Sequence, residues 1–189
     1  NVFNTEWFFI LNKEFLWGEK IWWYVIWYDP AKRSDIWAVL VWELKVSWAG
    51  KSYCQLIEEY QLKWEYQDQK WVLASIKQKY QIQANWWPVI VVIDWTQVWD
   101  VVAEMFGDII DYKVWYTSKW SRPSVDTYWA WKISKTHLVH LSQILIEKWI
   151  MKAYVWLKNL MDEMKNFKIF KTSSWWTKYE ADVWHDDHV

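Results

Sequence analysis

Apolar residues recur at two spacings along the chain, and the change between them separates a strand-rich first part from a mixed second part. Residues 22–28, 36–46 and 53–62 are rich in β-branched and aromatic side chains and are separated by polar turns, which predicts three antiparallel strands. Between residues 67 and 81 the apolar positions repeat every three or four residues, which predicts a helix. The chain therefore begins as an antiparallel meander followed by a helix.

A continuous apolar run, Val-Ile-Val-Val-Ile at residues 89–93, is typical of a strand that is covered on both faces in a parallel sheet. An apolar helix face follows from Val98 to Phe106 and ends at Gly107, before another strand at residues 112–116. This order predicts a strand-helix-strand crossover with the run at 89–93 as the central strand.

The remaining chain alternates polar stretches with helical patterns. Residues 117–131 are polar and predict an irregular segment, residues 134–148 predict a helix, and apolar positions from Leu157 to Met164 predict another. Residues 168–171 and 178–181 predict a small hairpin. Together these elements indicate an α/β fold with a mixed sheet, three antiparallel strands then parallel strands, flanked by helices.

Length and composition fit one domain. The 189 residues include 53% hydrophobic and 24% charged residues, with no run near the roughly 18 to 20 apolar residues that a membrane span needs. No signal-peptide pattern occurs in residues 1–13, and the single Cys54 cannot form an internal disulfide, so we expect an intracellular protein. A net charge of −1 means that any attraction for phosphate must come from local Lys and Arg clusters.

Tryptophan is unusually abundant. The chain has 23 Trp and 3 Gly, whereas ordinary usage predicts roughly 13 glycines. Several tryptophans occupy positions where turn chemistry favours glycine, including Trp86, Trp87 and Trp95, and Trp149 suits Gly or Arg. We hypothesise that many of them replace Gly or Arg, through engineering or a sequence error, because the Trp codon is one base from codons of both. The alternative is a genuinely Trp-rich protein with stacking platforms.

Two aspartates stand where predicted strands end. Asp29 follows the first strand and Asp94 follows the central strand. If the crossover places these strands side by side, both carboxylates emerge at the same end of the sheet. Neighbouring strands lie about 4.8 Å apart, so the two carboxylates can share divalent cations. Such hard oxygen ligands favour Mg²⁺ or Mn²⁺. An aspartate at a strand end is otherwise a turn former.

The span from Tyr24 to the end resembles the nuclease domain of the large terminase subunit of tailed viruses, which has a ribonuclease H-like fold. Four segments carry the resemblance in order and spacing: Tyr28 to Ala31 with Asp35 to Val39, Val91 to Thr96, a helix opened by Lys135 to Leu138 and ending near Trp149, and Tyr179 to Asp187.

The resemblance implies a two-metal endonuclease that cuts concatemeric double-stranded DNA during viral genome packaging. It implies that Asp29, Asp94, Asp186 and Asp187 bind two divalent cations, Mg²⁺ or Mn²⁺, and that a water molecule attacks the phosphodiester in line with the leaving 3′ oxygen. The implied partners are DNA, a packaging ATPase region, a small terminase and a portal, in the host cytoplasm and without a membrane. We expect residues 1–20 to be a lead-in or linker remnant and 21–189 to be the nuclease domain, truncated at the final helix.

Further residues are expected near the active end. His185 is a candidate metal or substrate contact. Six basic residues are candidates for holding the DNA backbone without reading sequence: Lys32, Arg33, Lys119, Arg122, Lys132 and Lys135. The family generally has glycine where this chain has Trp95, Trp99 and Trp184, and these indoles are expected to crowd the metal site.

Two other functions remain open. One is a different ribonuclease H-like nuclease, such as a junction resolvase or an RNA/DNA-hybrid nuclease. The other is a non-catalytic nucleic-acid-binding module that uses exposed Trp side chains.

Overall fold

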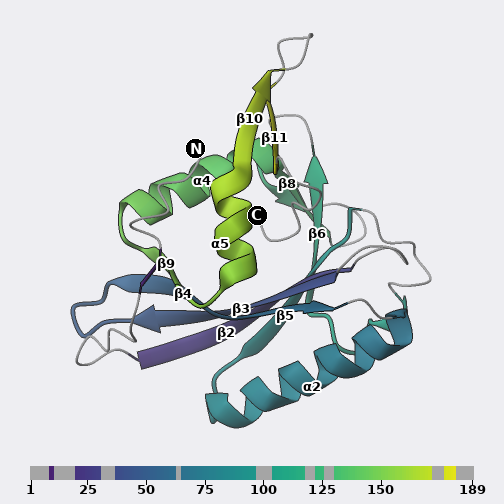
Figure 1. Cartoon of the computed structure of the whole chain (residues 1–189). Coiled ribbons are helices and arrows are strands. Elements are labelled where there is room, and N and C mark those ends of the chain that lie inside the picture. Colours follow the sequence, from purple (N-terminus) through teal and green to yellow (C-terminus); the bar gives the residue numbers. More distant parts are fainter. Residues whose placement is uncertain are drawn as a thin grey trace.

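A computed structural model shows a broad twisted sheet with helices on both faces (Figure 1). It describes residues 9–10, 20–30, 37–62, 65–96, 104–117, 122–125, 130–171 and 177–181. Within these ranges nine strands form one sheet in the order β1-β9-β4-β3-β2-β5-β6-β8-β7, and β10 pairs with β11 in a separate hairpin. The strands are β1 (Phe9–Ile10), β2 (Lys20–Asp29), β3 (Trp37–Val46), β4 (Ser52–Leu62), β5 (Val89–Asp94), β6 (Tyr112–Thr117), β7 (Ser124–Val125), β8 (Ala130–Ser134), β9 (Met151–Tyr154), β10 (Phe167–Lys171) and β11 (Thr177–Ala181); the helices are α2 (Tyr66–Ala84), α4 (Lys135–Glu147) and α5 (Lys158–Asn166).

The sheet is mixed, as the sequence predicts. β2, β3 and β4 are antiparallel neighbours, whereas β2, β5, β6 and β8 all run parallel. The continuous apolar strand β5 therefore lies between two parallel strands in the interior of the sheet. The crossover after β4 places β5 directly beside β2, which is the condition for bringing Asp29 and Asp94 to one edge.

Helix α2 covers one face of the sheet, and α4 and α5 lie over the other (Figure 1). The side chains that α2 buries recur at helical spacing, at Leu73, Ile76, Tyr80 and Ala84, and pack against the inward residues of β2 and β5. A second apolar cluster on the opposite face joins residues of β3 and β4 to α4 and α5. Side chains therefore alternate along β2 between two separate cores.

Four of the described strands were not expected from the sequence: β1 in the lead-in, β7 inside the segment predicted to be irregular, and β8 and β9. β8 extends into the segment predicted to be irregular, and β9 precedes α5 where a helix was predicted to follow α4 directly. All four strands are short, at two to five residues, so their period-two pattern is too brief to separate from a loop. β9 pairs with β4 and with β1, so the lead-in segment contributes an edge strand.

Other features follow the predictions or fall outside the described residues. The terminal hairpin forms as predicted. Most of the helix predicted after Asp94 lies outside the described residues. Among the helices that are described, none combines the length and apolar character needed to cross a bilayer.

Candidate metal centre

Asp29 and Asp94 lie side by side at the carboxyl ends of β2 and β5. The two strands are parallel with Tyr28 opposite Ile93, so the next residue of each strand reaches the same edge of the sheet. Tyr28 and Ile93 point into the core beneath α2, and Asp29 and Asp94 therefore point to the opposite face, beneath α4 and α5. Both aspartates are partly buried. This arrangement concentrates negative charge at one point of the sheet edge.

Backbone hydrogen bonds orient the Asp94 carboxylate. The Thr96 N–H donates to Asp94 Oδ1 at 2.8 Å, and the Tyr116 N–H donates to Thr96 Oγ1 at 2.8 Å. The Trp95 N–H also donates to the Val114 carbonyl oxygen at 2.7 Å. These bonds continue the contact between β5 and β6 beyond the end of the regular ladder, so Asp94 is fixed relative to β6.

Tyr116 is a site residue that the sequence reasoning missed. Val114 pairs with Asp94, so Tyr116, two positions later on β6, faces the same side as both aspartates. Burial and then the charges of Asp94 and Asp29 raise the pKa of Tyr116 well above its usual value. The signal in the sequence was the position of Tyr116 at the carboxyl end of the strand that follows β5, but its alignment with Asp94 depends on strand register.

The Tyr28 hydroxyl anchors the end of β2 from the opposite face. It donates to Gln69 Oε1 of α2 at 2.6 Å, within the buried core. Burial is the main cause that raises the pKa of Tyr28, with further contributions from Tyr66 and Asp29. The strand that carries Asp29 is therefore held by α2 below and by the sheet on either side.

The donor set suits a hard cation. Two adjacent, partly buried carboxylates offer oxygen ligands of the kind that Mg²⁺ and Mn²⁺ prefer, and a cation would offset their mutual repulsion. Within the part of the chain that the structure describes, no group of three or more His, Cys, Asp or Glu side chains is placed to hold a metal ion. Asp29 and Asp94 therefore fit two of the four positions of the proposed ligand set.

The C-terminal candidates Asp186, Asp187 and His185 lie outside the described residues. The hairpin before them is described: β11 pairs with β10 so that Ala181 lies opposite Phe167, directly after α5. The chain has thus returned to the end of a helix that covers the face carrying Asp29 and Asp94.

The candidate DNA-contacting residues are placed differently from one another. Lys32, Arg33 and Lys119 lie outside the described residues. Lys135 begins α4 directly after β8, whose last residue pairs with Thr117, so it lies at the same end of the parallel strands as the aspartates. Exposed Arg122 precedes β7 at the edge of the sheet near that end. Lys132 pairs with Trp115, which places it on the face opposite Tyr116.

Trp95 does not crowd the metal site, contrary to the expectation from the sequence. Its side chain belongs to the core beneath α2, on the opposite face from Asp94. Lys113 Nζ lies 4.1 Å from the centre of its ring. The alternation of side chains along the extended backbone after β5 explains the difference. Trp99 and Trp184 lie outside the described residues.

Comparison with known proteins relates the fold to solved structures. The large terminase nuclease of the thermophilic phage G20c, in a crystal structure with bound magnesium, matches with a TM-score of 0.63 and 21% identity, covering 100% of this chain and 91% of that chain. The nuclease domain of the Thermus phage P74-26 large terminase matches with a TM-score of 0.61 and 20% identity over 100% of this chain and 90% of that chain. The corresponding P22 domain gives a TM-score of 0.56 and 10% identity over 94% and 83%.

No protein-family model and no curated protein sequence matches the chain. The solved structures confirm the resemblance noted in the sequence at the level of the fold: this chain has the ribonuclease H-like fold of large terminase nuclease domains.

Proposed function

We propose that this chain is a metal-dependent endonuclease that cuts double-stranded viral DNA during genome packaging. The observation that carries the proposal is the juxtaposition of Asp29 and Asp94 at the carboxyl ends of neighbouring parallel strands. It is supported by a fold shared with terminase nucleases, among them G20c structures with bound magnesium and with bound cobalt. In this setting DNA is the substrate, and a packaging ATPase region, a small terminase and a portal are the partners in an infected host cell.

In the proposed reaction the chain's own residues hold and orient the reactants. Asp29 and Asp94, with Asp186 and Asp187, hold two divalent cations, Mg²⁺ or Mn²⁺, through carboxylate oxygens, and His185 contacts the metal or the substrate. When bound, such ions activate water and stabilise charge on phosphate oxygens. The Thr96 N–H keeps one Asp94 oxygen oriented, which limits the reorganisation needed when the cations bind.

The DNA backbone is held at the same end of the sheet. Lys135 at the start of α4 and Arg122 before β7 supply positive charge there, and Lys32, Arg33 and Lys119 complete the proposed set. Contacts of this kind position the duplex without reading its sequence and weaken as salt increases. Lys132 faces the side of the sheet opposite the aspartates and is not part of this set.

Replacing Asp29 by Asn tests the proposal. Asp29→Asn keeps the side-chain volume but removes the negative charge, so we expect plasmid nicking in Mn²⁺ to fall to background while thermal unfolding stays close to that of the parent. Asp94→Asn should behave alike. A parent rate of nicking in the Asp29 variant would contradict the metal assignment.

The matched control is Asp68→Asn. Asp68 is an exposed aspartate in the first turn of α2, on the opposite face of the sheet, and its loss should leave nicking unchanged. Linear, branched and RNA/DNA-hybrid duplexes should be compared in the same assay. Preferential cutting of branched or hybrid substrates would favour the other ribonuclease H-like nucleases over a packaging enzyme.

A further inference from the structure

The Tyr116 ring reaches across the sheet on the face that carries both aspartates. Tyr116 is on β6 and Trp27 is on β2, with β5 between them, which corresponds to strands roughly 10 Å apart. The two ring centres are nevertheless 6.0 Å apart, at an interplanar angle of 34°. Trp27 precedes Asp29 by two positions and shares its face. The Tyr116 side chain therefore reaches from β6 towards β2, over the strand that carries Asp94.

The Tyr116 backbone is also tied to Asp94. Its N–H bonds to Thr96 Oγ1, and the N–H of the same threonine bonds to Asp94 Oδ1. The Asp94 carboxylate and the Tyr116 backbone therefore share Thr96 as a hydrogen-bonding partner. The Tyr116 backbone is thus bonded to Thr96, which bonds Asp94, and the Tyr116 ring lies near Trp27 on the face that carries both aspartates.

We propose that Tyr116 is a positioning residue of the metal centre, whose hydroxyl holds the Asp29 and Asp94 carboxylates in the arrangement that binds divalent cations. This inference rests on the function proposed above. A phenol hydroxyl is a neutral donor, so it lowers the repulsion between two carboxylates without adding a charge that competes with the cation. Groups that orient metal-binding carboxylates in this way commonly contribute 10- to 100-fold to metal affinity.

Tyr116→Phe isolates the hydroxyl, because the ring and its contact with Trp27 are kept. Mn²⁺ binding to the whole chain should be measured by titration calorimetry, without DNA. We expect roughly 10- to 100-fold weaker binding in Tyr116→Phe, with thermal unfolding of the metal-free protein close to that of the parent. Nicking activity should return towards the parent rate when Mn²⁺ is raised to saturation.

Tyr112→Phe is the matched control. Tyr112 is exposed, begins β6 and lies four residues before Tyr116 on the same face, so removing its hydroxyl should leave Mn²⁺ affinity unchanged. Equal loss of affinity in the two variants would overturn a specific role for Tyr116, and so would parent affinity in Tyr116→Phe.

The outcomes also separate this inference from the proposed function. If the parent binds Mn²⁺ and Asp29→Asn does not, the proposed metal site stands, whatever Tyr116→Phe shows. If the parent binds no Mn²⁺, the metal site and the role of Tyr116 both fail.

Discussion

At the scale of single residues, backbone conformation indicates which tryptophans stand at glycine positions. Trp86 has φ 92° and Trp149 has φ 61°, in the left-handed region that β-carbon-bearing side chains rarely adopt. Gly50, at φ 73°, occupies a comparable turn with a glycine. Both tryptophans follow helices, where glycine commonly ends the helix. The structure thus supports the hypothesis of replaced glycines at these two positions.

Trp86→Gly is expected to stabilise the protein. The side chain is 97% exposed, so its removal costs little packing. Relief of about 1 to 3 kcal/mol of backbone strain exceeds the roughly 0.5 to 1 kcal/mol of added unfolded-state entropy. We expect the free energy of unfolding to rise by about 1 kcal/mol in urea denaturation. Trp149→Gly should gain less, because Lys152 Nζ lies 5.2 Å from its ring centre.

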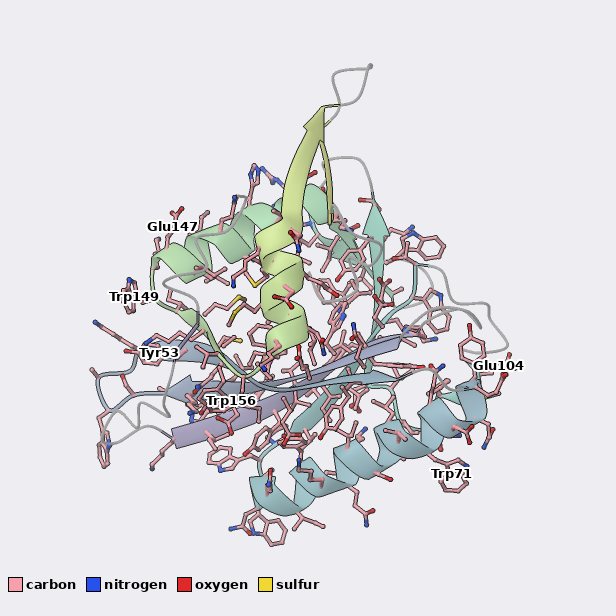
Figure 2. All side chains as sticks on the ribbon, in the orientation of Figure 1. Tyr53, Trp71, Glu104, Glu147, Trp149 and Trp156 are labelled. Atoms are coloured by element: carbon pink, nitrogen blue, oxygen red, sulfur yellow. The ribbon has the colours of Figure 1, made fainter. Side chains whose placement is uncertain are left out.

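The control for these changes is Trp71→Gly. Trp71 is also exposed but lies inside α2 (Figure 2), where glycine lowers stability by a few tenths to about 1 kcal/mol. A loss of stability in Trp86→Gly as large as that in Trp71→Gly would show that residue 86 is not a glycine position.

At the scale of whole elements, a side chain of β4 attaches α5 to the sheet. The Glu59 carboxylate of β4 accepts hydrogen bonds from the backbone N–H groups of Asn159 and Leu160, at 3.1 and 3.0 Å. These are orphan donors in the first turn of the helix, and a negative charge there also favours the helix dipole. A residue about a hundred positions earlier in the chain therefore caps α5, which leads directly into β10.

Glu59→Ala should loosen this attachment. Loss of the cap is expected to lower the free energy of unfolding by about 0.5 to 2 kcal/mol, and hydrogen exchange should become faster in α5 than in α2. Glu147→Ala is a suitable control because Glu147 is an exposed acid in the last turn of α4, where its removal should be neutral or slightly stabilising. Equal exchange in α5 of both variants would argue against the cap.

At the scale of the whole molecule, the exposed tryptophans within the described residues do not gather on one face. Trp71 lies on α2, whereas Trp149 lies beyond the end of α4 on the other side of the sheet (Figure 2). The ring of Trp156 stacks on Tyr154 of the core on that other side. Trp22, Trp115 and Trp131 are exposed on three different strands. A surface for stacking bases would gather such side chains on one face. The described residues therefore give no support to the non-catalytic binding module.

Metal binding should stabilise the folded chain as a whole. A ligand that binds only the folded state adds roughly 2.7 kcal/mol when its free concentration is 100 times its Kd. We therefore expect Mn²⁺ to raise the thermal unfolding midpoint of the parent, and EDTA to reverse the shift. Asp29→Asn should show no such increase, and an equal increase in that variant would place the bound Mn²⁺ elsewhere.

Much of the architecture was predictable from local patterns. Continuous apolar residues predicted β5 as an interior parallel strand, and helical spacing predicted α2, α4 and α5. The strand pattern that follows α5 predicted the terminal hairpin. The short strands β1, β7, β8 and β9 were not predicted because they have too few residues to show a period. The resemblance of separate segments to terminase nucleases added the order of the acids, and the comparison with solved structures confirms the fold alone.

The sequence by itself determined the types of elements, the strand ends at Asp29 and Asp94, and the excess of tryptophan at turns, because these depend on neighbouring residues. Tertiary structure alone decided that β5 pairs with β2, that Trp95 points away from Asp94, and that Tyr116 shares the face of both aspartates. The physical reason is register: a shift of one residue between strands reverses the face of every side chain. Pairings across dozens of residues fix that register, and no local pattern records them.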